Sequence, residues 1–323
     1  MRWRALCASA VYLMCCTLGA APVRAGSARL LPVQAFDSSR SPGAPVANAA
    51  FLPGEGALPA PAFAGVLMLR PARMQCQPAL LQPLIDGRDT RIFPGLQLEF
   101  FTIGDLLVPV QRGEMVRETG GGSTPSYWRV IPQFGKVWRE KGDGDWSRAA
   151  FPIMLVNDTE NHAHQGLATF LYKPGHVTGL LVQFVQQSSP YLIKQYFVAW
   201  GFVPAEYAQA DTSRLAARRT QAQAELSDRL PAKHWNELVK TVPPGALDGF
   251  GGPVHPKWRV AAALVKDGVL YYQDASTPYG PYPYPLEMRF GVRSVTKSVF
   301  APLALLRLAE VYGPWVLGLK VGD

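Results

Sequence analysis

A serine and a lysine stand three residues apart near the C-terminal end of the sequence, within RFGVRSVTKSVFAPLALLRLAEVYG at residues 289–313. If a helix begins at Ser294, its side chain neighbours that of Lys297, with Cβ atoms roughly 5–6 Å apart. A serine hydroxyl becomes a good nucleophile when a base takes its proton, and a lysine can be that base when burial lowers its pKa. Ser294 and Lys297 are therefore a candidate nucleophile and base. The alternative is a serine that caps an ordinary core helix, followed by a lysine that faces solvent.

The elements around this pair follow from local sequence patterns. The stretch RVAAALVKDGVLYY at 259–272 has two apolar runs around Asp267-Gly268, a strong signal for a β-hairpin. A loop rich in proline and tyrosine follows. Helical spacing after the serine then predicts a helix over 295–312, which Pro302 should bend because proline removes one backbone hydrogen bond.

This order of hairpin, loop and serine-bearing helix resembles the opening of the serine β-lactamase and penicillin-binding-protein superfamily, especially the class C β-lactamase-related serine hydrolases. The family phrase F-x-x-x-S-V-T-K-S is matched by Phe290, Ser294, Val295, Thr296, Lys297 and Ser298. The resemblance implies that an amide, β-lactam or ester carbonyl acylates Ser294, that Lys297 accepts its proton, and that the Ser294 backbone N–H forms half of an oxyanion hole. The implied partner is a small-molecule or peptide acyl substrate, which cell-wall material would provide. The implied chemistry needs no metal or other cofactor.

The resemblance covers about residues 257–323. The family has two further motifs downstream of its serine, Tyr-x-Asn or Ser-x-Asn and then Lys/His-Thr/Ser-Gly, whereas 26 residues follow Lys297 here. GHVTG at 175–179 echoes the last motif, but it lies upstream and is typical of a β-turn. We therefore expect 251–323 to be the N-terminal portion of a truncated hydrolase domain, inactive as given, that exposes an apolar helix face.

The N-terminus predicts export. Arg2 and Arg4 precede an apolar run of signal-peptide length, and Ala25 ends a plausible cleavage site. We expect a signal peptide over 1–25, a periplasmic or secreted protein, and no stable membrane span after cleavage; an uncleaved anchor is the alternative. Cleavage leaves 29 basic and 24 acidic residues, a net charge of +5 without the basic runs typical of nucleic-acid binding. It also leaves Cys76 as the single cysteine, which we expect to be half-buried and structural.

Composition argues against an all-helical protein, and the pattern of elements together with the resemblance indicates an α+β class, a β-rich domain followed by the start of a β-lactamase-like α/β domain. The chain is 48% hydrophobic with 30 glycines and 29 prolines, which suits short strands joined by turns. We expect a loosely packed Pro/Ala/Gly-rich leader over 26–62, a β-rich, sandwich-like domain over 63–205 and a helical connector over 206–250. Good helix formers predict the connector helix at 211–230, and its apolar face should hold Leu215, Ala222, Leu226 and Leu230.

Two other features allow a binding role. His162 and His164 form a His-x-His pair that can hold a metal ion, with His176 as a third ligand, although a polar hairpin loop is the simpler interpretation. The loop PYGPYPYP at 278–285 either rims a pocket or is a stiff surface loop. The alternative to a hydrolase is a β domain that binds cell-envelope carbohydrate or peptide and carries a vestigial hydrolase segment.

Overall fold

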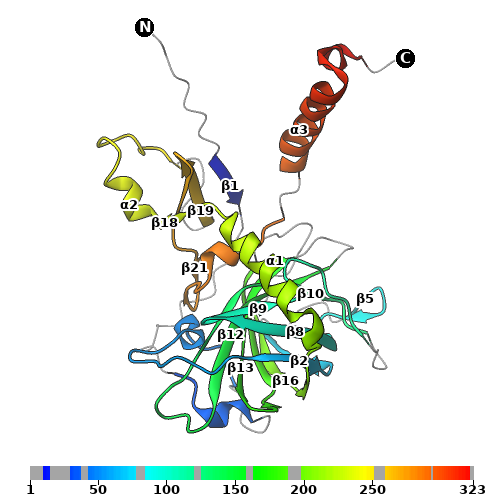
Figure 1. Cartoon of the computed structure of the whole chain (residues 1–323), viewed down its shortest axis with the longest axis vertical. Helices are drawn as coiled ribbons and strands as arrows, with labels where there is room; N and C mark the ends of the chain where they lie inside the picture. Colours follow the sequence, from blue (N-terminus) through cyan, green and yellow to red (C-terminus); the bar gives the residue numbers. More distant parts are fainter. Residues whose placement is uncertain are drawn as a thin grey trace. The chain divides into compact units, whose positions relative to one another are not determined.

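The computed structural model of this 323-residue chain divides into two compact units, residues 1–289 and 290–323 (Figure 1). The larger unit is β-rich with a large antiparallel sheet, which fits the expected α+β class. The structure describes residues 10–14, 30–37, 43–77, 84–119, 125–157, 163–187, 198–250, 259–291 and 294–320.

Twelve strands form one sheet, and each of the short apolar runs expected between 63 and 205 contains a strand. The strand order is β17-β2-β8-β9-β11-β12-β13-β15-β16-β4, with β10 paired to β12 and β14 to β13. The strands are β2 (Ala64–Leu69), β4 (Gln75–Gln77), β8 (Leu96–Ile103), β9 (Leu106–Pro109), β10 (Arg129–Pro132), β11 (Gly135–Trp138), β12 (Ser147–Val156), β13 (Ala163–Lys173), β14 (His176–Val177), β15 (Leu180–Gln187), β16 (Val198–Val203) and β17 (Ala205–Ala208).

This sheet closes on itself through one bent strand. β16 pairs with β15 up to Val203, and β17 begins two residues later and pairs with β2, starting opposite Leu69. Pro204 lies between the two strands, and its carbonyl accepts a hydrogen bond of 3.0 Å from the Arg70 amide. The sandwich-like domain expected from the sequence is thus one continuous curled sheet around a single interior.

Aromatic side chains fill that interior. Phe100 and Phe151 are fully buried with ring centroids 4.9 Å apart, and Phe63 meets Phe170 edge to face at 5.5 Å. Such geometry adds roughly 0.5–1.5 kcal/mol per pair beyond the burial of apolar area. Alternate residues of the strands supply these rings, because successive side chains of a strand point to opposite faces.

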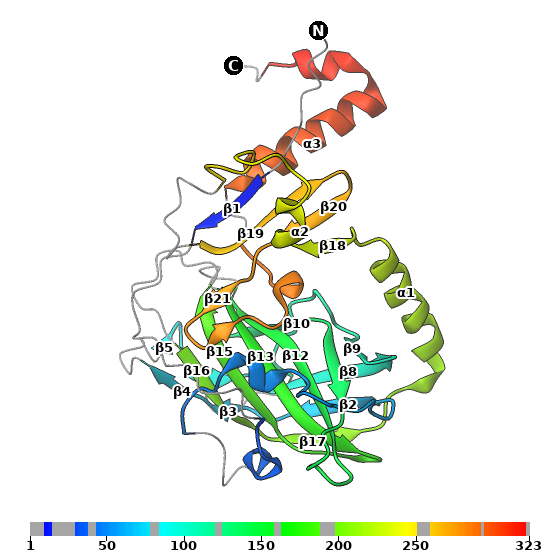
Figure 2. The ribbon, with the colours of Figure 1, turned by 90° about the vertical axis from the view of Figure 1, so that its left-hand side faces the viewer.

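The N-terminal segment lies on the outer face of the sheet, where Figure 2 shows its blue ribbon beside the green strands. It contains η1 (Val33–Phe36) and η3 (Asn48–Phe51), and Phe36, Asn48 and Phe51 are buried. Gln183 of β15 binds both the amide and the carbonyl of Val46, at 2.7 and 2.9 Å. The expectation of a loosely packed leader is therefore corrected for residues 30–37 and 43–51, because the apolar outer face of the sheet needs a cover.

The tyrosine-rich loop is a second cover. It contains the hairpin β21 (Ser276–Thr277) and β22 (Gly280–Pro281), followed by η6 (Pro285–Glu287). Tyr282 and Tyr284 are buried, and their hydroxyls donate to the carbonyls of Gly166 at 2.8 Å and Phe51 at 3.3 Å. This loop is thus neither a pocket rim nor a surface loop at these two tyrosines, because both rings are packed against the sheet.

The predicted hairpin forms part of a smaller, four-stranded sheet with the order β1-β19-β20-β18. Asp267 and Gly268 have φ values of 50° and 75°, the left-handed conformations that a two-residue hairpin turn requires. Leu238 of α2 packs against Leu264 and Tyr271, so part of the expected connector 206–250 belongs to this sheet. Its elements are β1 (Ala10–Met14), β18 (Ala232–His234), α2 (Trp235–Val239), β19 (Arg259–Lys266) and β20 (Val269–Tyr272).

The helix expected at 211–230 forms as η4 (Thr212–Arg214) and α1 (Leu215–Ser227). Ala222 is fully buried, and α1 packs on the outer face of the large sheet through Leu215 and Leu226. Leu230 is 48% exposed because the helix ends before it. The larger unit also contains two-stranded sheets of two-residue strands. One is the β21–β22 hairpin, and the others pair β3 (Ala72–Arg73) with β7 (Ile92–Phe93) and β5 (Leu84–Ile85) with β6 (Arg88–Asp89).

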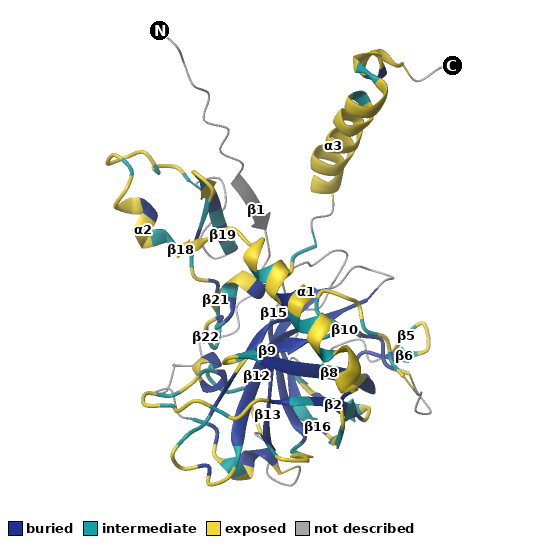
Figure 3. Cartoon of the chain, in the orientation of Figure 1, coloured by how far each residue is buried: buried dark blue, intermediate teal, exposed yellow. Residues whose placement is uncertain are grey.

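The smaller unit consists of α3 (Val295–Tyr312), as predicted from helical spacing, and η7 (Pro314–Gly318). Pro302 lies inside α3, and no residue of α3 is buried, as the yellow ribbon in Figure 3 shows. Among the described residues, no helix combines the length and the hydropathy needed to cross a membrane.

Close strand packing at Gly135 gives a test of the curled sheet. A Cβ atom at Gly135 would lie 2.1 Å from the Ala150 carbonyl oxygen, whereas a Cβ at Gly142 would meet nothing within 4 Å. We expect Gly135→Ala to lower the free energy of unfolding by about 3 kcal/mol and Gly142→Ala to change it by less than about 0.5 kcal/mol, measured by urea denaturation. Equal stabilities for the two variants would contradict this packing.

Candidate functional site

Ser294 and Lys297 lie together on the first turn of α3. Ser294 occupies the N-cap position, and its carbonyl accepts a hydrogen bond of 3.0 Å from the Lys297 amide. The Ser294 side chain makes no capping hydrogen bond. The predicted placement of the pair on one helical turn is thus present, and the serine hydroxyl does not perform the capping role that was its alternative.

Both side chains of this pair are exposed to solvent. Within the part of the chain that the structure describes, neither the Ser294 hydroxyl nor the Lys297 ammonium makes a hydrogen bond or ion pair. A hydroxyl surrounded by water and out of contact with a base is a weak nucleophile. The arrangement therefore holds the two reacting groups near each other without the contact that would activate the serine.

The chain upstream of the pair is fixed to the large sheet at Arg289. The Arg289 guanidinium donates to Gln133 Oε1 at 3.2 and 3.3 Å, from Nη2 and Nε, and its amide donates to Gln165 Oε1 at 3.4 Å. The Gln165 amide also binds the Arg289 carbonyl. Both glutamines are buried. The last residue of the larger unit, five positions before Ser294, is consequently held by one side chain from β13 and one from the connection between β10 and β11.

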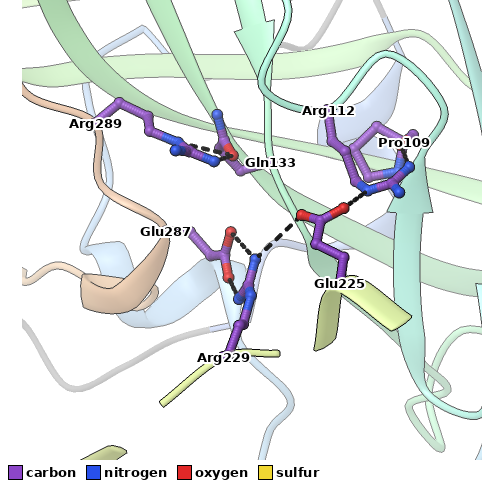
Figure 4. Close-up of polar contacts among 7 residues, drawn as sticks. All are labelled: Pro109, Arg112, Gln133, Glu225, Arg229, Glu287 and Arg289. Atoms are coloured by element: carbon purple, nitrogen blue, oxygen red, sulfur yellow. Dashed lines mark hydrogen bonds and ion pairs between the residues drawn. The ribbon is translucent and has the colours of Figure 1, made fainter. Parts of the chain in front are cut away.

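Charged residues of α1 form the second part of this anchor, as Figure 4 shows. Arg229, just after α1, pairs with Glu287 of η6 and lies 3.9 Å from Glu225. Glu225 in turn accepts from Arg112 Nε at 2.5 Å. The guanidinium of Arg229 lies 4.6 Å from the ring centroid of Phe134, and that of Arg112 lies 5.6 Å from it. This charged cluster joins the helix, the loop after β9 and the segment that leads to Ser294.

Sequence reasoning missed this anchor because its residues are far apart in the chain. Gln133 was the available signal, since it is an isolated amide in the otherwise apolar stretch VIPQFG. A polar side chain at such a position is buried only when it has hydrogen-bond partners. The pattern indicates that partners exist but does not say which residues supply them.

Only one residue of the His162–His164 pair belongs to the part of the chain that the structure describes. His162 lies outside the described residues, whereas His164 of β13 is buried with its ring 5.2 Å from that of Trp128. His176 is exposed and pairs with Lys173, nine positions along β13 from His164 and so roughly 30 Å away. The structure does not bring His176 to His164. Among the described residues no group of three or more His, Cys, Asp or Glu side chains is placed to hold a metal ion.

Two other sequence features are structural. Cys76 of β4 is half-buried as predicted, and burial raises the pKa of its thiol to about 11, so the thiol stays protonated at neutral pH. GHVTG at 175–179 begins in a turn at Gly175, which has a φ of 71°, and continues as the short strand β14, after which Thr178 Oγ1 accepts a hydrogen bond of 2.9 Å from the Leu171 amide. Neither feature lies in the same unit as Ser294.

The Arg229–Glu287 pair gives a test of the anchor. The Glu287 side chain is 10% exposed, so Arg229→Ala leaves a nearly buried carboxylate without its cation. We expect a loss of about 1–3 kcal/mol in the free energy of unfolding. Lys240→Ala removes an exposed pair with Glu237 and should change it by less than about 0.5 kcal/mol.

A double variant distinguishes the cost of leaving the Glu287 carboxylate unpaired from the cost of losing the packing of the Arg229 side chain. If the carboxylate causes the loss, Arg229→Ala/Glu287→Ala will be less destabilised than the sum of the two single variants. Additive losses in urea denaturation would show that the pair contributes no coupling.

Comparison with known proteins does not identify the site. No family model matches the chain, and no curated protein or solved structure matches it either. The assignment of Ser294 and Lys297 therefore depends on their residue types, on their place at the start of α3 and on the sequence phrase that surrounds them.

Proposed function

We propose that Ser294 and Lys297 are the nucleophile and general base of a serine hydrolase of the β-lactamase and penicillin-binding-protein type. In this proposal 251–323 is the N-terminal portion of its catalytic domain, and the protein acts in the periplasm or outside the cell. The observation that carries the proposal is the placement of both residues on the first turn of α3, with the serine hydroxyl not used as a cap.

The proposed reaction proceeds through an acyl-enzyme. Lys297 takes the proton from Ser294 Oγ as that oxygen attacks an amide, β-lactam or ester carbonyl carbon. The Ser294 backbone N–H supplies one donor to the oxygen that becomes negative, and the leaving group departs with a proton. Water then attacks the Ser294 ester, releasing the acid and restoring the hydroxyl.

This chemistry requires more than the pair provides by itself. A tetrahedral intermediate needs a second donor, and a lysine acts as a base when its surroundings exclude water. Within the described residues both side chains are open to solvent. The proposal therefore assigns reacting residues and a reaction type, and it predicts that the 323-residue chain by itself turns over little or no substrate.

Covalent probes test both statements. We expect the 323-residue chain to take up no more fluorescent penicillin or fluorophosphonate than its Ser294→Ala variant, because serine and lysine are not in contact. Labelling of the chain that is lost in Ser294→Ala would contradict this expected inactivity.

The reading frame beyond codon 323 tests the function. If it encodes Tyr-x-Asn and Lys/His-Thr/Ser-Gly motifs, the longer protein should be labelled at Ser294, and Lys297→Ala should slow labelling by about 10²- to 10⁴-fold. Ser298→Ala, one residue beyond the lysine, is the matched control and should label normally. An unlabelled longer protein, or a frame without these motifs, would contradict the hydrolase proposal.

A binding function for the β-rich unit has one observation in its favour. A small, partly open pocket of about 20 Å³ lies between the N-terminal segment and strands β15 and β16, where it is lined by Leu31, Phe51, Gln183 and Trp200. Trp200 gives this pocket an aromatic wall, a feature that suits contact with the edge of a sugar ring or with a peptide side chain.

Calorimetric titration with N-acetylglucosamine oligomers and cell-wall peptides tests this second function. We expect Trp200→Phe to weaken binding about tenfold, since the smaller ring removes part of the aromatic wall. Trp315→Phe, at a tryptophan that is 62% exposed, is the control and should bind normally. No binding, or equal binding by both variants, would remove the case for this function.

A further inference from the structure

The N-terminal segment is attached to the large sheet at two buried points, with a less buried stretch between them. Phe36 of η1 and Phe51 of η3 are 3% and 1% exposed. Residues 43–47, which precede η3, are by contrast exposed or half-buried. Segments with few buried apolar contacts open locally at a lower free-energy cost than the elements that flank them. We therefore expect residues 43–47 to separate from the sheet while both phenylalanines stay in place.

One buried glutamine holds this stretch on the sheet. Gln183 of β15 is 2% exposed, and its Oε1 accepts a hydrogen bond of 2.7 Å from the Val46 amide. Its Nε2 donates to the Val46 carbonyl at 2.9 Å and to Asn48 Oδ1 at 3.2 Å. The N–H and the C=O of one residue lie on the same side in extended backbone, which is how a neighbouring strand pairs with both. The Gln183 amide thus binds Val46 as a neighbouring strand would, through backbone atoms alone.

Opening of residues 43–47 leaves the Gln183 side chain without both of its bonds to Val46. A buried amide group that loses its hydrogen bonds is unfavourable, so the open state favours any ligand that restores them. An extended peptide offers the N–H and C=O of one residue in the same arrangement as Val46. The occupant that the structure shows is peptide backbone, so peptide is the class of ligand whose fit is already displayed.

The space beside Val46 limits the side chain that such a peptide carries. The pocket of about 20 Å³ is lined by Val46 on one side and by Leu181 and Trp200 on the other. This volume is close to that of a single water-sized probe, and most of its walls are apolar. It therefore has room for about one methyl group more than its present occupant supplies. We expect a small or β-branched apolar residue at the position that Val46 takes.

We propose that residues 43–47 are an intramolecular stand-in for an extended peptide, and that Gln183 recognises the backbone of the peptide that displaces them. The inference deepens the binding function proposed for the β-rich unit, on which it rests, by naming peptide as the ligand and the N-terminal segment as its competitor. Such a competitor lowers the apparent affinity by the fraction of molecules that are open, which for a minor state is about 0.1–10%.

Fluorescence polarisation with labelled acetyl-GAPVA-amide, the sequence of residues 43–47, tests the competition on the full chain. Val46→Pro removes the amide that donates to Gln183, so this variant should bind the probe about tenfold or more tightly than the parent chain. Ala44→Pro places the same ring at an exposed position of the same stretch. It is the matched control and should bind the probe as the parent does. Equal affinity of the parent and Val46→Pro would overturn the proposal.

A chemical change in the probe tests the role of Gln183 without altering the protein. Methylation of the valine nitrogen removes the N–H that donates to Gln183 Oε1, so Val46→Pro should bind this probe about tenfold more weakly than the unmethylated one. In the parent chain, a millimolar concentration of the unmethylated probe should speed up hydrogen exchange of the Val46 amide, and the methylated probe should not. This second measurement remains decisive if Val46→Pro does not fold. Equal binding of the two probes, or unchanged exchange, would contradict recognition by Gln183.

The two binding proposals fail separately. Suppose that N-acetylglucosamine oligomers bind the parent chain and lose affinity in Trp200→Phe, while the probe displaces nothing. The β-rich unit then binds sugar, and the assignment of peptide recognition to Gln183 is wrong. If neither ligand binds, both proposals are wrong.

Discussion

The central strands β12 and β13 are buried on both faces, and this constraint determines the arrangement of the larger unit. One face is satisfied by the aromatic interior of the curled sheet. The other face would be exposed without a cover. Residues 30–37 and 43–51 cover it from the N-terminal side of the sequence, and residues 275–289 cover it from the C-terminal side. Because burying a backbone or amide group without a partner costs free energy, these covers are joined to the sheet by hydrogen bonds from Gln183, Tyr282 and Gln165.

The second cover also connects the fold to the candidate site. The segment that ends at Arg289 runs over the sheet because its tyrosines are buried there, and the Arg229–Glu287 pair fastens its last turn to α1. The chain therefore leaves the larger unit from a fixed residue, five positions before Ser294. In this way a packing requirement of the β-rich unit fixes where the serine-bearing unit begins.

Local signals made much of the secondary structure predictable. Asp267-Gly268 specifies its turn through backbone conformation, and spacing of apolar residues specifies α1 and α3, so these elements were predicted correctly. Closure of the sheet at Pro204, the packing of the leader and the burial of Tyr282 were not predicted, because each depends on residues more than 100 positions away. The same division applies to the site. The Ser294–Lys297 pair is local and could be found from the sequence, whereas the glutamine and arginine contacts upstream of it could not.

Exposure to water affects both the candidate site and the apolar side chains of α3. Water solvates both Ser294 and Lys297 and thereby keeps the hydroxyl protonated and the two groups apart, and the same water makes the apolar side chains of α3 unfavourable where they are. Whatever encloses the first turn of α3 removes water from both. Burial of the first turn would favour a neutral lysine there, which is the form that can act as a base toward serine. A cover confined to Leu303 and the residues after it would stabilise the helix and leave the pair solvated. The reactivity of Ser294 therefore depends on which part of α3 is enclosed, and exposure of the whole helix is the state in which that reactivity is lowest.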